Sequence, residues 1–310
     1  MQKSSITAND GCKLAFQTSL PLPAPAPQPD TCIILLHGFS GSGAYFTRNF
    51  SLISSTYWVV APDMRGHGDS GRTRGGYHVA RLATDLRSIV TYLRRASHQE
   101  LKIIPVGCSI GAAVLWTYVE LFGCEDFSGF VFVDQAPLQD RSPFGNWGDK
   151  KAHKGCYDEA TMRSAQNFWI HDSDAAYRDL AHSSLGYRHL PKATEDISEE
   201  QKKTDEELFV GISALCDQEW LAKLMCDHTR YDHREAVESI DRPTLVMYGR
   251  RSGCFTYEGV SETAVLINRK CNGEELASVT AYDSGHWLFY EEPERFSREI
   301  MDFVKKCAAE

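Results

Sequence analysis

The sequence lacks the features that would tie it to a membrane or to a polyanion. No run of about 18 apolar residues, the minimum for a transmembrane helix, occurs in its 310 residues. Basic residues are few: 33 Lys and Arg stand against 42 Asp and Glu, for a net charge of −9. An acidic chain without a basic block is a poor binder of nucleic acid or anionic lipid. The polar start MQKSSITANDGC does not read as a signal peptide, so we expect a soluble cytoplasmic protein without nucleic-acid or membrane partners.

The ten cysteines lack the close pairing that structural zinc sites use. No C-x-x-C pair occurs, and the cysteines are scattered from position 12 to position 307. Scattered thiols in a chain without an export signal are typically reduced and fill small spaces in an apolar core. We therefore expect no metal and no cofactor.

Short, continuous apolar runs recur along the chain and alternate with helical patterns. Continuous hydrophobicity indicates strands that are covered on both faces, as in a parallel sheet. The runs are residues 32–36, 58–61, 103–106, 130–133, 244–248 and 277–281, after a strand pair that turns at 9–11. Helical periodicity marks residues 79–97, 110–122 and 293–306. This alternation predicts an α/β fold with a doubly wound, mostly parallel sheet.

One segment interrupts the alternation. Residues 138–240 contain no segment with strand character and several helical stretches, among them 199–216 and 218–226. About 100 residues of helix and loop between two strands predict a helical cap or lid. We therefore expect an α/β core formed by residues 1–137 and 241–310, with the cap inserted at 138–240.

The strongest local signal is the pentapeptide Gly107-Cys108-Ser109-Ile110-Gly111, a G-x-S-x-G sequence. It lies between an apolar strand and a helix, which is the context of a nucleophile elbow. The glycines permit a tight turn that lifts the Ser109 hydroxyl above the sheet edge. The helix N-terminus behind the turn offers backbone donors to negative charge. Cys108 precedes the middle of the elbow and is expected to point into the sheet.

A second glycine-rich segment, His37-Gly38-Phe39-Ser40-Gly41, follows the strand at 32–36. Loops at the carboxyl ends of parallel strands are where α/β proteins form their sites. Its glycines let a backbone N–H, that of Phe39, point into the site. Together with the N–H of Ile110 it would supply the two donors of an oxyanion hole. His37 itself reads as a structural histidine.

Among the 11 histidines, position singles out His286. It lies in Ser284-Gly285-His286-Trp287, on the loop between the strand at 277–281 and the last helix. A histidine on such a loop can reach over a nucleophile and act as a general base near neutral pH.

Four motifs occur together in one order: HGFSGSG, APDMRGHGDS, GCSIG and GHWLFYEEPERF. In order and spacing the set resembles the α/β-hydrolase superfamily, over nearly the whole chain outside the insertion. The resemblance implies that Ser109 is the nucleophile, His286 the base, and Phe39 and Ile110 the oxyanion donors. It is specific for the fold and far less specific for the substrate.

The same resemblance assigns the segment DMRGHGDS to the family's structural loop, so His67 and Asp69 are not expected to be catalytic. At one position the sequence departs from the family pattern. The acid partner usually follows the next-to-last strand in a G-x-x-D pattern, and here Ser252 stands where that Asp is expected. A neutral hydroxyl cannot stabilise an imidazolium as a carboxylate does. Three explanations are open: the acid lies elsewhere, the site is a Ser–His dyad, or catalysis is lost.

The first explanation is favoured by Asp134, which lies just past the strand at 130–133 and 25 positions after Ser109. Some α/β-hydrolase relatives carry their acid at the end of this earlier strand, among them fungal zearalenone-type lactone hydrolases and cofactor-free quinolone dioxygenases. By that resemblance Asp134 completes the triad. The alternatives are that Asp134 only caps a turn before Pro137, or that Glu258 supplies the acid.

The expected function is a serine hydrolase that cleaves a carboxylic ester or lactone of a small, largely apolar substrate. Aromatic residues of the insertion would line its pocket and bind the substrate, namely Phe144, Trp147 and Trp169, although any one ring can equally pack the cap helices. The same scaffold also hosts cofactor-free oxygenases, C–C bond hydrolases, lyases and haloperoxidase-like enzymes. A non-catalytic ligand-binding protein is the remaining alternative.

Overall fold

A computed structural model of the chain describes residues 1–141, 147–271, 273 and 275–309. Within these residues, eight strands form one sheet in the order β1-β2-β4-β3-β5-β6-β7-β8. Their bounds are β1 (Gln2–Thr7), β2 (Lys13–Thr18), β3 (Thr31–Leu36), β4 (Trp58–Pro62), β5 (Lys102–Cys108), β6 (Phe130–Val133), β7 (Thr244–Gly249) and β8 (Ala277–Tyr282). Strands β1 and β2 are antiparallel to their neighbours, and all pairs from β4 to β8 are parallel. The predicted α/β fold class is thereby confirmed.

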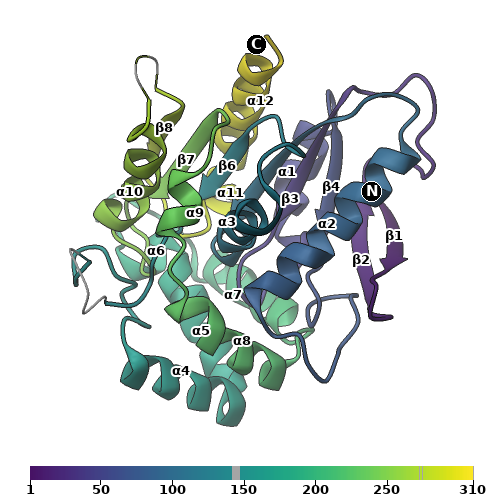
Figure 1. Cartoon of the computed structure of the whole chain (residues 1–310). Coiled ribbons are helices and arrows are strands. Elements are labelled where there is room, and N and C mark those ends of the chain that lie inside the picture. Colours follow the sequence, from purple (N-terminus) through teal and green to yellow (C-terminus); the bar gives the residue numbers. More distant parts are fainter. Residues whose placement is uncertain (142–146, 272, 274, 310) are drawn as a thin grey trace.

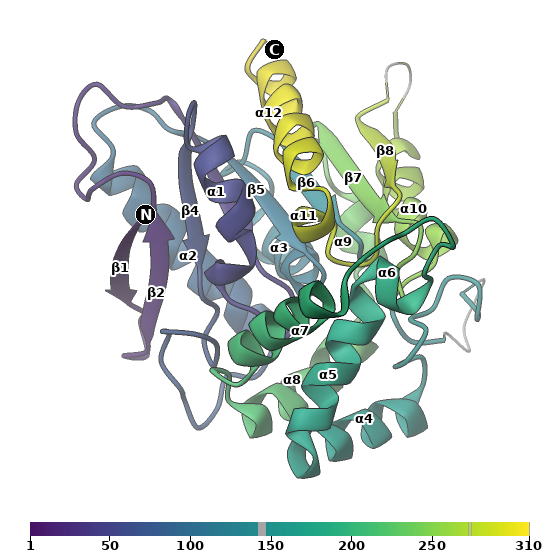
Figure 2. The same cartoon turned by 180° about the vertical axis from the view of Figure 1, so that it is seen from behind.

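Helices cover both faces of this sheet (Figures 1 and 2). One face carries α1 (Thr47–Ile53), α11 (Leu288–Glu291) and α12 (Pro293–Ala309). The other face carries α2 (Val79–Ala96), α3 (Ile110–Phe122) and α10 (Tyr257–Asn268). A short 3₁₀ helix, η1 (Gly43–Phe46), leads into α1.

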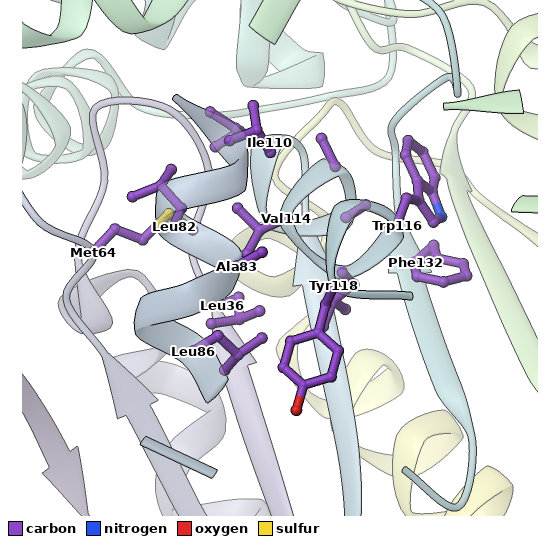
Figure 3. Packing of buried hydrophobic residues seen from close by; sticks show 14 of the residues in the cluster. Leu36, Met64, Leu82, Ala83, Leu86, Ile110, Val114, Trp116, Tyr118 and Phe132 are labelled. Carbon is purple, nitrogen blue, oxygen red and sulfur yellow. The ribbon is translucent and has the colours of Figure 1, made fainter. Parts of the chain in front are cut away.

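The strand side chains divide between two cores, one on each face. In β3, Ile33 and Leu35 pack with α1 and α12, whereas Ile34 and Leu36 pack with α2 and α3. Figure 3 shows the second core, where Leu36 and Phe132 of the sheet lie beneath side chains of α2 and α3. Because successive strand residues face opposite sides, burial on both faces requires continuous hydrophobicity, which is the pattern of the sequence.

The segment between β6 and β7 contains no strand among its described residues. Its helices are α4 (Glu159–His171), α5 (Ser173–Ser184), α6 (Gly186–His189), α7 (Glu199–Ser213), α8 (Gln218–Arg230) and α9 (Arg234–Glu238). Helix α4 packs on α8 and α5 on α7, at one end of the sheet, whereas α9 packs against α3 and α10 (Figures 1 and 2). No helix in the described ranges is long and apolar enough to cross a bilayer.

Several histidines are held in the folded chain without charge. Burial lowers the pKa of each: to about 4 for His37, to about 3 for His67, His153 and His233, and well below 6.5 for His228. The unfolded chain protonates these rings below pH 6.5, while the folded chain does not. Their contribution to stability is therefore fully present above pH 6.5 and is lost as the pH falls below it.

This predicts a steep decline of the unfolding free energy between pH 6.5 and 5, to which each such histidine adds about 1.4 kcal/mol per pH unit. His233 provides the test, because neither of its ring nitrogens has a hydrogen-bond partner among the described residues. We expect His233→Phe to reduce this slope by one histidine's share, as measured by urea unfolding at several pH values. An unchanged slope would contradict the assignment.

Candidate active site

The segment around Ser109 forms a sharp turn from β5 into α3. Ser109 has φ 53° and ψ −124°, a left-handed conformation that is strained for a residue other than glycine. The neighbouring glycines are required by space. A Cβ on Gly107 would lie 2.6 Å from the Ala112 nitrogen, and one on Gly111 would lie 2.8 Å from the Leu36 carbonyl oxygen. The packing of this turn thus requires the two glycines of the G-x-S-x-G sequence.

The residue before Ser109 points away from the site. Cys108 is buried in the core that faces α1 and α12, and burial raises the pKa of its thiol well above the usual value. A protonated, inaccessible thiol is a poor nucleophile.

The loop after β3 passes close to Ser109. A Cβ on Gly38 would lie 3.2 Å from the Ser109 Cβ. The next N–H, that of Phe39, donates to no described residue, and neither does that of Ile110. Ile110 is the first residue of α3, so its N–H has no carbonyl partner one turn earlier in the helix. Both backbone donors are available beside the serine.

His37 has a structural role in the same loop. Its Nε2 accepts from the Met64 N–H (2.9 Å), so Nδ1 carries the proton and donates to the Gly38 carbonyl oxygen (2.7 Å). The loop that follows β4 is held in a similar way. Asp63 accepts hydrogen bonds from the backbone N–H groups of Gly43 and Asp69, both at 2.8 Å.

Asp134 and His286 form a buried pair. The Asp134 carboxylate is fully buried, and its Oδ2 lies 2.6 Å from His286 Nδ1. Its Oδ1 accepts from the Gly249 N–H at 3.0 Å, and Oδ2 also accepts from the Ser252 hydroxyl at 2.6 Å. These hydrogen bonds compensate a carboxylate that would otherwise be costly to bury. Glu258, the alternative acid, is exposed in the first turn of α10.

Ser252, which stands where the family usually has its acid, therefore contacts the Asp134 carboxylate. Its Oγ donates to Asp134 and accepts from the Cys254 and Phe255 N–H groups at 3.2 and 3.3 Å. Because β6 and β7 are neighbouring parallel strands, an acid at the end of either strand reaches the same point. The hydroxyl takes the role of a donor to the carboxylate.

Ser109 and His286 line one cavity of about 240 Å³ between the sheet and the inserted helices. Its wall is largely apolar, and it includes Phe39, Phe168, Trp169, Leu180, Met225 and Trp287. Of the three predicted substrate-binding aromatics, Trp169 lies in this wall. Trp147 does not: it is buried beside Lys151 and Arg234, which lie over its ring, and it borders a different hollow. Phe144 lies outside the described residues.

The polar residues of the wall that sequence reasoning missed include Gln139, His153 and His228. None belongs to a motif, and they lie far apart in the sequence: Gln139 and His228 are separated by 89 positions. Only the tertiary packing of these segments brings them to one cavity.

Comparison with known proteins agrees with this fold. A model of the α/β-hydrolase fold family matches residues 31–293. The AB hydrolase superfamily protein YisY of Bacillus subtilis is 24% identical over 287 residues, which cover 87% of this chain and 90% of that protein. An esterase from Exiguobacterium antarcticum has a TM-score of 0.78 at 17% identity, covering 97% of this chain and 99% of its own. The enol-lactonase from Burkholderia xenovorans LB400 has a TM-score of 0.75 at 15% identity, covering 97% and 100%.

The contact between Ser252 and Asp134 generates a prediction about stability. Ser252→Ala removes a hydrogen bond to a buried carboxylate and leaves two backbone N–H groups without their acceptor. We expect the unfolding free energy to fall by about 2 kcal/mol. The measurement is urea unfolding beside Ser51→Ala, a surface substitution that should change nothing. Equal stability of the two variants would show that the Ser252 bond contributes no net stability.

Proposed function

The chain belongs to the α/β-hydrolase fold family and is an enzyme of that family, and we propose that it is a serine hydrolase of carboxylic esters or lactones. The observation that carries the proposal is the buried Asp134–His286 pair, 2.6 Å apart, in a cavity that Ser109 also lines. In this proposal Ser109 is the nucleophile, His286 the general base and Asp134 the acid.

The Asp134 carboxylate accepts a hydrogen bond from His286 Nδ1–H, which keeps the proton on Nδ1 and leaves Nε2 free to take the Ser109 proton. The resulting alkoxide attacks the ester or lactone carbonyl and forms a tetrahedral intermediate. His286 then returns the proton to the leaving oxygen, and an acyl-enzyme on Ser109 remains. His286 next activates a water molecule, which hydrolyses the acyl-enzyme and restores the serine.

The negative charge of the intermediate is stabilised by the backbone N–H groups of Phe39 and Ile110. Each donor of this kind is worth about 3 kcal/mol in the transition state. Two features of the loops support this role: neither N–H donates to any residue that the structure describes, and Gly38 brings its backbone close to Ser109.

The apolar wall of the cavity favours a small, largely hydrophobic substrate, with Trp169 in contact with it. No Lys or Arg is among the described residues that line the cavity, so a polyanionic substrate is not favoured. In this proposal residues 138–240 act as a cap that closes the cavity. The esterase and the enol-lactonase among the similar structures support the reaction class.

Substitutions of Ser109 and Asp134 should lower activity, whereas substitution of the nearby carboxylate Glu258 should not. We expect Ser109→Ala to abolish hydrolysis of p-nitrophenyl esters, and Asp134→Asn to lower kcat by about 10³- to 10⁴-fold. Glu258→Gln is the matched control and should leave kcat unchanged, because Glu258 is exposed on α10. Initial rates over a series of acyl lengths provide the measurement.

A fluorophosphonate probe tests the same proposal without a substrate. Covalent labelling of the native chain, lost in Ser109→Ala and retained in Cys108→Ala, is the expected result. Full activity of Ser109→Ala would overturn the proposal, and an absence of labelling would favour ligand binding or non-covalent chemistry.

A further inference from the structure

Among the polar side chains of the cavity wall that the proposed mechanism does not use, three form one cluster. They are Gln139 from the loop after β6, His153 from the segment before α4, and His228 from α8. We call them the polar subsite. Gln139 and His228 are 4% and 6% exposed, and the Nε2 atoms of these two side chains lie 2.7 Å apart. The His153 N–H donates to the Gln139 carbonyl oxygen at 2.9 Å, so the three residues form one cluster.

The hydrogen bonds of His153 define its tautomer. Its Nδ1 accepts from the backbone N–H groups of Gly155 and Cys156, both at 2.8 Å. An accepting Nδ1 carries no proton, so the neutral ring carries it on Nε2. Burial lowers the pKa of His153 to about 3, and the ring is therefore neutral near pH 7. Among the described residues no group accepts the Nε2 proton.

Gln139 presents the complementary group. Its amide nitrogen donates to His228 Nε2, and the side-chain oxygen Oε1 has no partner in the described part of the chain. Among the described residues, His153 thus leaves a donor and Gln139 an acceptor without a partner, and both residues line the same cavity. A ligand in that cavity can supply both partners.

The position and charge of the subsite limit which chemical group of a ligand it can bind. The His153 ring packs edge-on against Phe255 (4.8 Å between centroids), and Phe255 lies 5.8 Å from the His286 ring. The Phe255 ring therefore connects the subsite to His286, the proposed general base. The ligand group should be uncharged, because no cation lines the described wall and Asp179 adds an acidic side chain. A secondary amide is a neutral group that offers one acceptor and one donor on adjacent atoms, and in its trans form they point to opposite sides.

Resting on the proposed function, we propose that the polar subsite binds a secondary amide carried by the ester or lactone substrate. The amide oxygen accepts from His153 Nε2–H, and the amide N–H donates to Gln139 Oε1. His228 is a positioning residue, which holds the Gln139 side chain through its Nε2. The enzyme would then select amide-bearing esters over hydrocarbon esters of the same length.

The test compares p-nitrophenyl esters of equal chain length: heptanoate, 6-oxoheptanoate and 4-acetamidobutanoate, with hexanoate and octanoate counterparts to vary the amide position. At the best length, we expect kcat/KM of the native enzyme to favour the amide over the plain chain by about tenfold or more. The ketone, which only accepts, should lie between them.

Two substitutions separate recognition from loop structure. His153→Asn retains an oxygen at the place of Nδ1, so it can still accept from Gly155 and Cys156, but it lacks the Nε2 donor. We expect it to lower the amide preference by about tenfold. Gln139→Met should reduce the amide preference to that of the ketone. His171→Phe, on the exposed end of α4, is the control and should leave the preference unchanged.

A binding measurement tests amide recognition without relying on turnover. In Ser109→Ala, tryptophan fluorescence can follow binding of methyl 4-acetamidobutanoate and methyl heptanoate, because Trp169 and Trp287 line the cavity. A preference for the amide ester in binding, without turnover by the native enzyme, would overturn the proposed hydrolysis and retain the subsite. Turnover without amide preference at any length, or a native-like preference in His153→Asn, would overturn the subsite.

Discussion

The buried Asp134 carboxylate is the interaction on which the site depends. Three separate segments donate to it: the end of β7 through Gly249, the following loop through Ser252, and the loop after β8 through His286. A carboxylate at 0% exposure is costly to bury without such partners. The charge therefore holds the ends of three neighbouring strands in one arrangement, and the position of His286 follows from it.

The approach of these loops requires residues without side chains. A Cβ on Gly249 would collide with the Gly285 carbonyl oxygen, and a Cβ on Gly285 would collide with the Ser184 carbonyl oxygen of α5. Glu291 accepts from the Gly285 N–H at 2.6 Å and from the Gly186 N–H at 3.0 Å. The inserted helices thus contact the His286 loop directly, so the insertion bears on the geometry of the base as well as on the cavity wall.

Two sets of elements form the cavity: the loops at the carboxyl edge of the sheet and the helices between β6 and β7. Its floor is built from loops that follow β3, β5, β7 and β8, where any parallel sheet gathers side chains at its carboxyl edge. Much of its wall is built from the helices between β6 and β7, which bring residues such as Trp169, Leu180 and Met225 to the cavity. Structures at 15 and 17% identity share the fold over nearly the whole chain.

The sequence by itself determined the strands of the sheet, three of its covering helices (α2, α3 and α12) and the elbow at Ser109. Continuous apolar runs, helical periodicity and the spacing of glycines are local patterns, and each reports burial or backbone conformation directly. It also singled out Asp134 and His286, since each follows a strand whose end can be read from the chain.

Only the tertiary structure decided how Ser252 relates to Asp134 and which side chains line the cavity. The hydroxyl donates to the carboxylate because β6 and β7 are adjacent, which no local pattern encodes. Trp147 packs beneath Lys151 and Arg234 rather than in the cavity wall, and His153 lies in that wall without belonging to any motif. Such placements depend on contacts between segments far apart in the chain, and the hydrophobicity of a single residue does not specify them.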